Sequence, residues 1–246
     1  MKPLSSFLPS NFPSYSPRDV SLQPVSDIEV MRWETLATKE PETINWISSM
    51  KKESVFIDIG ANIGPYTLTA YFRGVANIVS FEPFPASFHS LENTLRYNSI
   101  STIHLFRMGI SDELKLVNLV GQSLDTGAAE FSYTQSYFNS LQTCLLCRFD
   151  PFLPLLKQNP IYIKVDVDGS ELSVLDGLSC VLELKLPISI LVESDVANLQ
   201  EVTAFMSRKG FVRDEKYDGY LPHSDSRRLS ESGNTARNIF FSNQIS

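Results

Sequence analysis

The stretch VFIDIGANIG, from Val55 to Gly64, constrains the fold of this chain more than any other. Its first residues are β-branched or aromatic and run directly into Asp58, which predicts a buried central strand with an acid at its tip. Gly60 and Gly64 then allow a sharp turn and the close approach of a ligand. Pro65 opens an apolar-periodic helix, where its missing N–H costs nothing. Together, strand, glycine loop and helix predict a pocket of free backbone N–H groups.

The charge of this loop separates two classes of cofactor. The dinucleotide fingerprint has G-x-G-x-x-G spacing and holds a pyrophosphate at the helix N-terminus, whereas this loop has G-x-x-x-G spacing. Asp58 would repel a pyrophosphate by roughly 1 kcal/mol or more in a partly buried cleft. S-adenosylmethionine instead offers a carboxylate to the loop and an ammonium to the acid. The pattern therefore favours S-adenosylmethionine, with Asp58, Gly60, Asn62 and Gly64 as candidate cofactor-binding residues.

A second acid follows the next expected strand. NIVSFE, from Asn77 to Glu82, predicts another buried strand that ends in an acid. Glu82 lies 22 positions after Gly60, and an acid near that distance is placed for the two ribose hydroxyls of a nucleoside. A bidentate carboxylate would select an unphosphorylated ribose. The alternative is a polar strand terminus that binds no ligand.

Four ordered motifs resemble the FkbM family of S-adenosylmethionine-dependent methyltransferases over roughly residues 30–242. They are DIGANIG at 58–64, FEPFP at 81–85, IKVDVDGSE at 163–171 and LVES at 191–194, and KEPETINWI at 39–47 also resembles that family. The resemblance implies a single Rossmann-like α/β domain over residues 26–246, with a mostly parallel seven-stranded sheet, helices on both faces and an antiparallel closing strand. It also implies that Ser111 and Asp112 lie near the adenine, although a plain Ser-Asp turn is the alternative.

Composition limits the possible partners. The 246 residues suffice for one domain with a large core, and the net charge of −7 argues against nucleic acid or an anionic membrane as the main partner. No run approaches the ~18 apolar residues of a membrane span. Residues 1–25 are rich in Pro and Ser, which predicts an arm that is flexible or draped over the domain, rather than a signal peptide.

The three cysteines suggest a reducing, cytoplasmic compartment, because their count is small and odd. Cys144 and Cys147 form a C-x-x-C on an expected strand, where positions three apart point to opposite faces. This pattern favours buried thiols over a redox or metal role.

The remaining patterns predict the other elements. We expect helices at 40–50, 64–73, 86–98 and 197–209, and strands at 102–107, 115–120, 141–149, 161–166, 187–193, 210–215 and 236–242. Asp150 before Pro151 predicts a further helix start, and mid-helix His89 predicts a solvated or packing histidine. Two polar stretches are candidate substrate walls: 121–140, which contains Tyr133, Tyr137 and Phe138, and 216–235, which contains Tyr217.

The candidate catalytic residues are Asp166, Asp168 and Glu193, which end or follow adjacent expected strands. A hydroxyl acceptor in an in-line methyl transfer needs a group that receives its proton, and clustered acids raise one another's pKa toward neutrality. Three other roles stay open: contact with the cofactor's ammonium, for which Asp166 is a candidate, binding of a divalent cation, and capping of the helix near Gly169. No dedicated metal ligand set is predicted.

Two further residues in this motif shape the hypothesis. The FkbM pattern usually has Glu where this chain has Asp168, which weakens a direct role of Asp168 as the base. Lys164 is expected to form a structural salt bridge with a neighbouring acid.

The prediction is a methyltransferase that uses S-adenosylmethionine and acts on an oxygen of a small molecule or sugar. The alternatives are a nucleotide-dependent oxidoreductase and a non-catalytic scaffold with the same fold.

Overall fold

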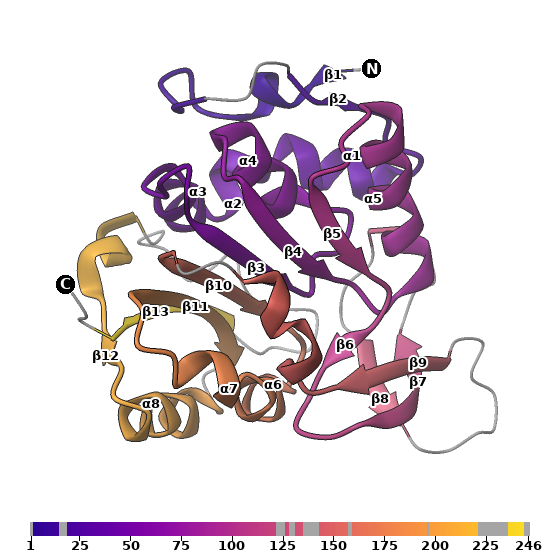
Figure 1. Ribbon diagram of the computed structural model, residues 1–246. Coiled ribbons are helices and arrows are strands. Elements are labelled where there is room, and N and C mark those ends of the chain that lie inside the picture. The colour runs from indigo at the N-terminus through magenta and orange to yellow at the C-terminus, as the bar shows by residue number, and fades with distance from the viewer. Residues whose placement is uncertain are drawn as a thin grey trace.

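A seven-stranded sheet forms the centre of the protein (Figure 1). The computed structural model describes residues 2–14, 19–121, 126–127, 131–134, 143–156, 159–195, 197–220 and 236–243. The strand order is β12-β13-β11-β10-β3-β4-β5, in which β11, β10, β3, β4 and β5 run parallel and β13 runs antiparallel to both of its neighbours. The predicted mostly parallel sheet with an antiparallel closing strand is therefore confirmed. Its strands are β3 (Val55–Ile59), β4 (Asn77–Phe81), β5 (Ile103–Phe106), β10 (Ile161–Asp166), β11 (Ile188–Asp195), β12 (Val212–Arg213) and β13 (Ala236–Ser242).

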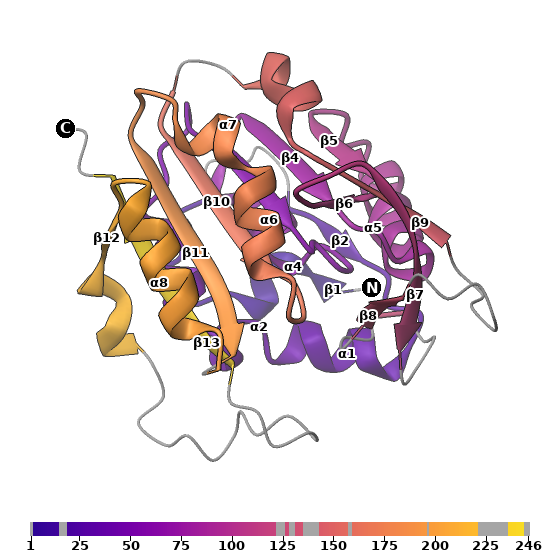
Figure 2. The same cartoon turned by 90° about the horizontal axis from the view of Figure 1, so that it is seen from below.

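Helices cover both faces of this sheet, as predicted (Figures 1 and 2). Successive strand residues point to opposite faces, so Ile57 and Ile163 join one core cluster while Asp58 and Lys164 point to the other face. The first cluster packs against α6 (Glu171–Gly177), α7 (Ser179–Leu182) and α8 (Leu199–Arg208). The opposite face is covered by α3 (Pro41–Ser48), α4 (Pro65–Arg73) and α5 (Pro85–Tyr97).

The predicted boundaries agree with these helices and strands to within two residues at each end. α4 shows the local reasons. Gly64 precedes it with a left-handed backbone (φ +88°), Pro65 occupies its first position, and Gly74 ends it with φ +93°. One expected start is different: Asp150 does not cap a helix but begins the short 3₁₀ helix η2 (Asp150–Leu155), which follows Phe149.

A second sheet lies beside the carboxyl end of β5, with the order β6-β9-β7-β8. The expected loop at 121–140 is partly wrong, because residues 131–134 form a strand in which Tyr133 pairs with Leu119. Tyr137 and Phe138 lie outside the described residues. The strands are β6 (Gly109–Ile110), β7 (Lys115–Gly121), β8 (Phe131–Thr134) and β9 (Thr143–Cys147).

The C-x-x-C pair lies on β9, and both thiols are buried, as predicted. Cys144 packs with Phe84 and Val117, whereas the Cys147 thiol lies 3.8 Å from the sulfur of Met108. Burial, followed by the charge of Glu82, raises the pKa of Cys144 to about 12, which keeps this thiol protonated.

The N-terminal segment packs against α4 and α5. Leu4 and Leu22 are fully buried in the same cluster as Leu68 and Leu91. The described part of this segment therefore lies along α4 and α5. The predicted mobility of residues 1–25 stays a prediction. Its elements are β1 (Lys2–Pro3), η1 (Leu4–Phe7) and β2 (Ser21–Leu22), followed by α1 (Asp27–Glu34) and α2 (Leu36–Lys39).

The second stretch expected to form a substrate wall, residues 216–235, contributes Tyr217 to the hydrophobic core. Tyr217 in η3 (Glu215–Tyr220) is buried against Phe240 with ring centroids 4.8 Å apart, and its hydroxyl lies 3.0 Å from Ser49 Oγ. Tyr217 therefore does not line a substrate wall, and residues 221–235 lie outside the described part of the chain. Among the helices that the structure describes, none combines the length and apolar character needed to cross a membrane.

Candidate active site

Four of the predicted site acids lie at the carboxyl ends of neighbouring parallel strands. Asp58 lies in β3, Glu82 follows β4, Asp166 ends β10, and Glu193 lies opposite Asp166 on β11. Ligands of open α/β sheets bind outside the carboxyl ends of the strands. The structure therefore brings these acids to the one edge of the sheet where such a fold binds ligands.

The amides of the glycine loop are bonded within the chain. Gly60 and Ala61 both donate to the carbonyl of Phe81 at 3.0 Å, and Gly64 donates to Ala61 at 2.8 Å. Asn62, which has φ +51°, donates from its N–H to Glu82 Oε2 at 2.7 Å. The expected pocket of free N–H groups is therefore wrong for these residues, because the left-handed turns coil the loop onto its own acceptors.

The two glycines are required by contacts with the protein itself. A Cβ on Gly60 would lie 1.9 Å from the backbone oxygen of Asp166, and one on Gly64 would lie 2.3 Å from Leu91 Cδ1. Both residues also have positive φ. These positions therefore let β3, β10 and α5 approach one another, and they hold the loop in a fixed shape.

Asp58 lies beneath the start of α4 and is 1% exposed. Its Oδ2 accepts a hydrogen bond from Thr67 Oγ1 at 2.6 Å, and Thr67 also lies 2.8 Å from Ser80 Oγ. Its Oδ1 is buried with no hydrogen-bond partner among the described residues. Burial, only partly offset by the charge of Lys164, raises the pKa of Asp58 to about 6.

Glu82 joins the glycine loop to the segment after β4. Its two oxygens accept from the N–H groups of Asn62 and Phe84, each at 2.7 Å, and the residue is 6% exposed. Burial outweighs these hydrogen bonds and raises the pKa of Glu82 to about 7. Since a carboxylate oxygen can accept more than one hydrogen bond, both oxygens retain capacity for hydroxyl donors.

Lys164 forms the expected salt bridge, which is with Asp166. The ammonium has no exposure and lies 4.6 Å from the centre of the Tyr66 ring. Burial opposes its charge, but Asp166, Glu40 and Asp58 hold the pKa of Lys164 above its usual value. Burial also opposes the charge of Asp166, and the Lys164 ammonium nevertheless holds the pKa of Asp166 well below its usual range.

The third candidate base is separate from the other two. Asp168 is exposed in the loop after β10, whereas Asp166 and Glu193 lie opposite each other on β10 and β11. Among the described residues, no side chain caps the start of α6; Glu171 is its first residue, and its Oε1 accepts from the N–H of Gly169, in the loop before the helix, at 2.9 Å. The acid found at that helix start is therefore Glu171, which the sequence interpretation did not single out.

Ser111 and Asp112 follow β6. Ser111 is buried, its hydroxyl donates to Asp112 Oδ1 at 2.8 Å, and its N–H donates to the carbonyl of Cys147. The Ser111 hydroxyl, more than any other contact, lowers the pKa of Asp112. A Cβ on Gly177 would lie 2.2 Å from the backbone carbonyl oxygen of Ser111, so residues 111 and 112 pack tightly against the end of α6. Their predicted contact with adenine stays a prediction.

Several polar residues of this region were missed from the sequence. Glu40 and Glu42 are buried, and Asn238 on β13 donates to their carboxylates at 3.1 and 2.9 Å. Asn238 lies opposite Glu193 in the sheet register. The motif KEPETINWI contained the signal for the two glutamates, whereas Asn238 had none, because only the antiparallel pairing of β13 brings it here.

These contacts decide whether S-adenosylmethionine fits the carboxyl ends of the strands. The protein's carboxyls there can accept hydrogen bonds or face positive charge, which suits the ammonium, sulfonium and ribose hydroxyls of that cofactor. The buried Asp58 Oδ1 without a described partner has the same preference. Within the described ranges, no three His, Cys, Asp or Glu side chains are grouped so that they could hold a metal ion.

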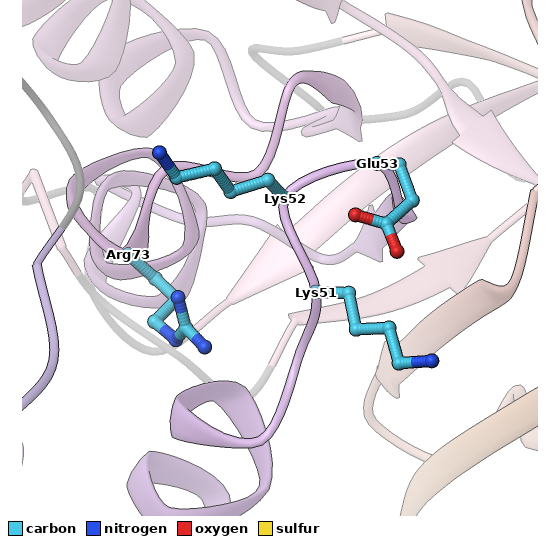
Figure 3. Close-up of a pocket in the computed structure, with 4 residues that line it drawn as sticks. All are labelled: Lys51, Lys52, Glu53 and Arg73. Carbon is cyan, nitrogen blue, oxygen red and sulfur yellow. The ribbon is translucent and has the colours of Figure 1, made fainter.

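A hollow at the opposite edge of the sheet has a different character. It is lined by Lys51, Lys52 and Glu53, just before β3, and by Arg73 at the end of α4. Arg73 Nε donates to the carbonyl of Ser48 at 2.8 Å, and the two lysine ammonium groups point away from each other (Figure 3). The hollow is separated from the acids by the length of β3.

His89 is exposed on α5, as predicted, and its ring lies 3.4 Å from Glu92. It contributes to the helix surface rather than to the carboxyl edge.

Comparison with known proteins gives three results. No curated protein matches the chain. Solved structures match it weakly: a precorrin-6y C5,15-methyltransferase from Geobacter metallireducens GS-15 (11% identity, 91% of this chain and 92% of that one, TM-score 0.46), the putative methyltransferase yhhF from Escherichia coli (14%, 95% and 96%, 0.45) and a putative RNA methyltransferase, PH1948, from Pyrococcus horikoshii (11%, 85% and 80%, 0.42). These scores are too low to support a conclusion about activity.

The third result is a family match. A family model described as "Methyltransferase FkbM domain" matches residues 58–213, which is more than half of the chain. The matched span begins at Asp58 and contains the glycine loop, Glu82, Lys164, Asp166 and Glu193. The chain therefore belongs to the FkbM methyltransferase family.

Proposed function

We propose that this protein transfers a methyl group from S-adenosylmethionine to a hydroxyl oxygen of a small molecule or sugar. The main support is the chemical character of the carboxyl edge. Its carboxyls favour a ligand that brings positive charge and hydrogen-bond donors. The loop amides already donate within the chain, so they are proposed to hold neither a pyrophosphate nor the carboxylate of the cofactor. A dinucleotide would bring its pyrophosphate against Asp58, so the oxidoreductase alternative is disfavoured.

Each residue has a proposed role in holding the cofactor. Glu82 accepts from the ribose hydroxyls, and Asp58 and Asp166 provide negative charge for the ammonium. Gly60, Asn62 and Gly64 keep the loop wall in place, and Ser111 and Asp112 lie toward the adenine. When bound, the cofactor supplies an activated methyl group on a positively charged sulfur.

The proposed base for the acceptor hydroxyl is the pair of Asp166 and Glu193, which lie in register on adjacent strands. Asp168 is less suited to this role because it is exposed to water and is one methylene shorter than the family's usual Glu. The acceptor class is proposed from the net charge of −7, which disfavours a nucleic-acid substrate. The free Cys144, Cys147 and Cys180 support a reducing, cytoplasmic location.

Calorimetry tests the cofactor. We expect S-adenosylmethionine and S-adenosylhomocysteine to bind and NADH to give no heat. Glu82→Ala should weaken binding at least tenfold, whereas Glu92→Ala, which removes an acid paired with Arg96 on the surface of α5, should bind as wild type. Absence of binding by either adenosyl ligand would contradict the proposal, and binding of NADH alone would favour the oxidoreductase.

A separate screen tests the acceptor. Small hydroxyl compounds and sugars are incubated with the protein and a methyl-labelled donor, and the products are identified by mass spectrometry. Methylation of RNA alone would contradict the proposed acceptor class. Cofactor binding without transfer to any acceptor would favour the non-catalytic scaffold.

A further inference from the structure

A cluster of ionisable side chains lies beneath the proposed cofactor edge, on the face of the sheet that α3 and α4 cover. Lys164 is its buried cation, bonded to Asp166 and placed under the Tyr66 ring. Asp166 and Glu193 occupy matched positions on adjacent parallel strands, so their side chains point to the same face. The titratable groups around Lys164, Asp166 and Glu193 come from β3, α4 and the segment from α2 to α3: Asp58, Tyr66, Lys39, Glu40 and Glu42.

The cluster contains more carboxyls than cations. Lys39 contacts Glu40 at 3.6 Å, but its side chain is half exposed, so Lys164 is the cation that is fully withdrawn from water. Like charges crowded in a partly buried site favour protonation of one of them. Asp166 and Glu193 are in register on adjacent parallel strands, so their carboxyls are such like charges, and a proton on one of them would let it donate a hydrogen bond to the other.

The position of Lys164 determines which carboxyl keeps the charge. Its ammonium bonds directly to Asp166, which favours the ionised form of that residue. Glu193 lies across the strand pair, and burial, followed by the charges of Asp166 and Glu40, raises the pKa of Glu193 well above its usual value. Geometry and electrostatics therefore assign the anion to Asp166 and the proton to Glu193.

We propose that Asp166 and Glu193 form a carboxyl pair that shares one proton, that Lys164 is the positioning residue that fixes this proton on Glu193, and that the pair releases it when a ligand with additional positive charge binds at the carboxyl edge. The last part rests on the proposed function, since S-adenosylmethionine is such a ligand.

The pair would then return to its starting state in each turnover. On ligand binding, the Glu193 O–H bond breaks and the proton passes to the solvent. During transfer, the acceptor oxygen bonds to the methyl carbon as the carbon–sulfur bond breaks, the electron pair of that bond stays on sulfur, and the acceptor's proton passes to the Asp166–Glu193 pair. The positive charge lost from sulfur is therefore matched by the proton that the pair gains.

Carbon NMR of the full, ligand-free chain tests the pair without any cofactor. With ¹³C-labelled side-chain carboxyls, and Glu193→Gln and Asp166→Asn to identify the signals, we expect Glu193 to be protonated at pH 7 and Asp166 to stay ionised down to pH 4. In Lys164→Met, Asp166 should begin to titrate above pH 4, and Lys164→Arg should restore the wild-type curve. An ionised Glu193 in wild type at pH 7 overturns the proposal, and this reading is available even where Lys164→Met fails to fold.

Calorimetry in two buffers of different ionisation enthalpy, phosphate and Tris, counts the protons released on binding. We expect S-adenosylmethionine to release about one proton more than the uncharged-sulfur product S-adenosylhomocysteine in wild type. Glu193→Gln should lose this difference, whereas Glu53→Gln, at the opposite end of the sheet, should keep it. Equal proton release in wild type and Glu193→Gln overturns the proposal. Failure of both ligands to bind contradicts the proposed function, and the NMR titration then decides the state of the pair by itself.

Discussion

The loops after β3 and β10 leave adjacent strands at the same edge, yet they are built in opposite ways. Residues 60–64 are bonded through their own amides, and each glycine touches another part of the protein. In the second loop, Asp168 and Gly169 are exposed, and a Cβ on Gly169 would meet nothing within 4 Å. A glycine with positive φ is therefore required by packing in the first loop, whereas in the second it is required by backbone geometry and its N–H is bonded to Glu171. We expect the first loop to be rigid and the second to be open to solvent.

Alanine substitution at each glycine is the most severe test of this difference. Gly60→Ala adds a left-handed backbone cost to an overlap with the Asp166 carbonyl, so we expect the free energy of unfolding to fall by roughly 4 kcal/mol. Gly169→Ala has the same kind of backbone, φ +75°, with open space around it, and should lose about 1 kcal/mol. Urea unfolding measures both, and equal losses would contradict the packing argument.

The acid beneath the rigid loop should make stability depend on pH. Because the pKa of Asp58 rises from its usual 3.8 to about 6 on folding, the folded state holds more protons between these values. This contribution to stability is fully present below pH 3.8 and is lost as the pH rises through 6. Asp58→Asn cannot ionise and so does not lose this stability. The difference in free energy of unfolding, variant minus wild type, should therefore rise by about 2 kcal/mol from pH 4 to pH 8. Urea unfolding at pH 4, 6 and 8 gives the comparison, and a constant difference across this range is the contrary result.

Glu82 tests how far the loop depends on its carboxylate. In Glu82→Gln, the amide NH₂ must face the N–H of either Asn62 or Phe84, so one of two charge-assisted hydrogen bonds is lost. Burial, however, raises the pKa of Glu82 to about 7, so the charge itself costs stability above that pH. By urea unfolding we expect Glu82→Gln to gain about 2 kcal/mol relative to wild type between pH 4 and pH 8, with the gain centred about one pH unit above that of Asp58→Asn, whose amide oxygen can keep the Thr67 bond. A loss of stability in Glu82→Gln at pH 8 would show that the loop depends on the charge.

Most of the fold could be predicted because strand and helix periodicity are local. The run from Ile161 to Asp166 became β10 without a shift, and the Gly64-Pro65 start and the Gly74 end of α4 were evident from residue chemistry. The second sheet was harder to foresee. β8 lies in a Gly-, Ser- and Tyr-rich stretch whose composition resembles a loop, and only its pairing with β7 makes it a strand.

The site could be predicted in part. The sequence indicated which acids share an edge, because parallel strands bring their carboxyl ends together. It did not show that the loop amides are already bonded, since the acceptors lie on Phe81 and Glu82, on and beyond a different strand. It also did not show that Tyr217 is core, because that depends on the closing strand that carries Phe240.

The smallest expected effect belongs to the open loop. Asp168 is exposed, so Asp168→Ala should change the free energy of unfolding by less than about 0.5 kcal/mol. If Asp168 does not contact the cofactor, the affinity for S-adenosylhomocysteine measured by calorimetry should also change by less than threefold, whereas Glu82→Ala weakens it at least tenfold. Asp168→Glu restores the usual residue of the family and serves as the conservative control. A large loss of affinity in Asp168→Ala with unchanged stability would move Asp168 into the cofactor site, and the open loop would then be part of the wall that binds it.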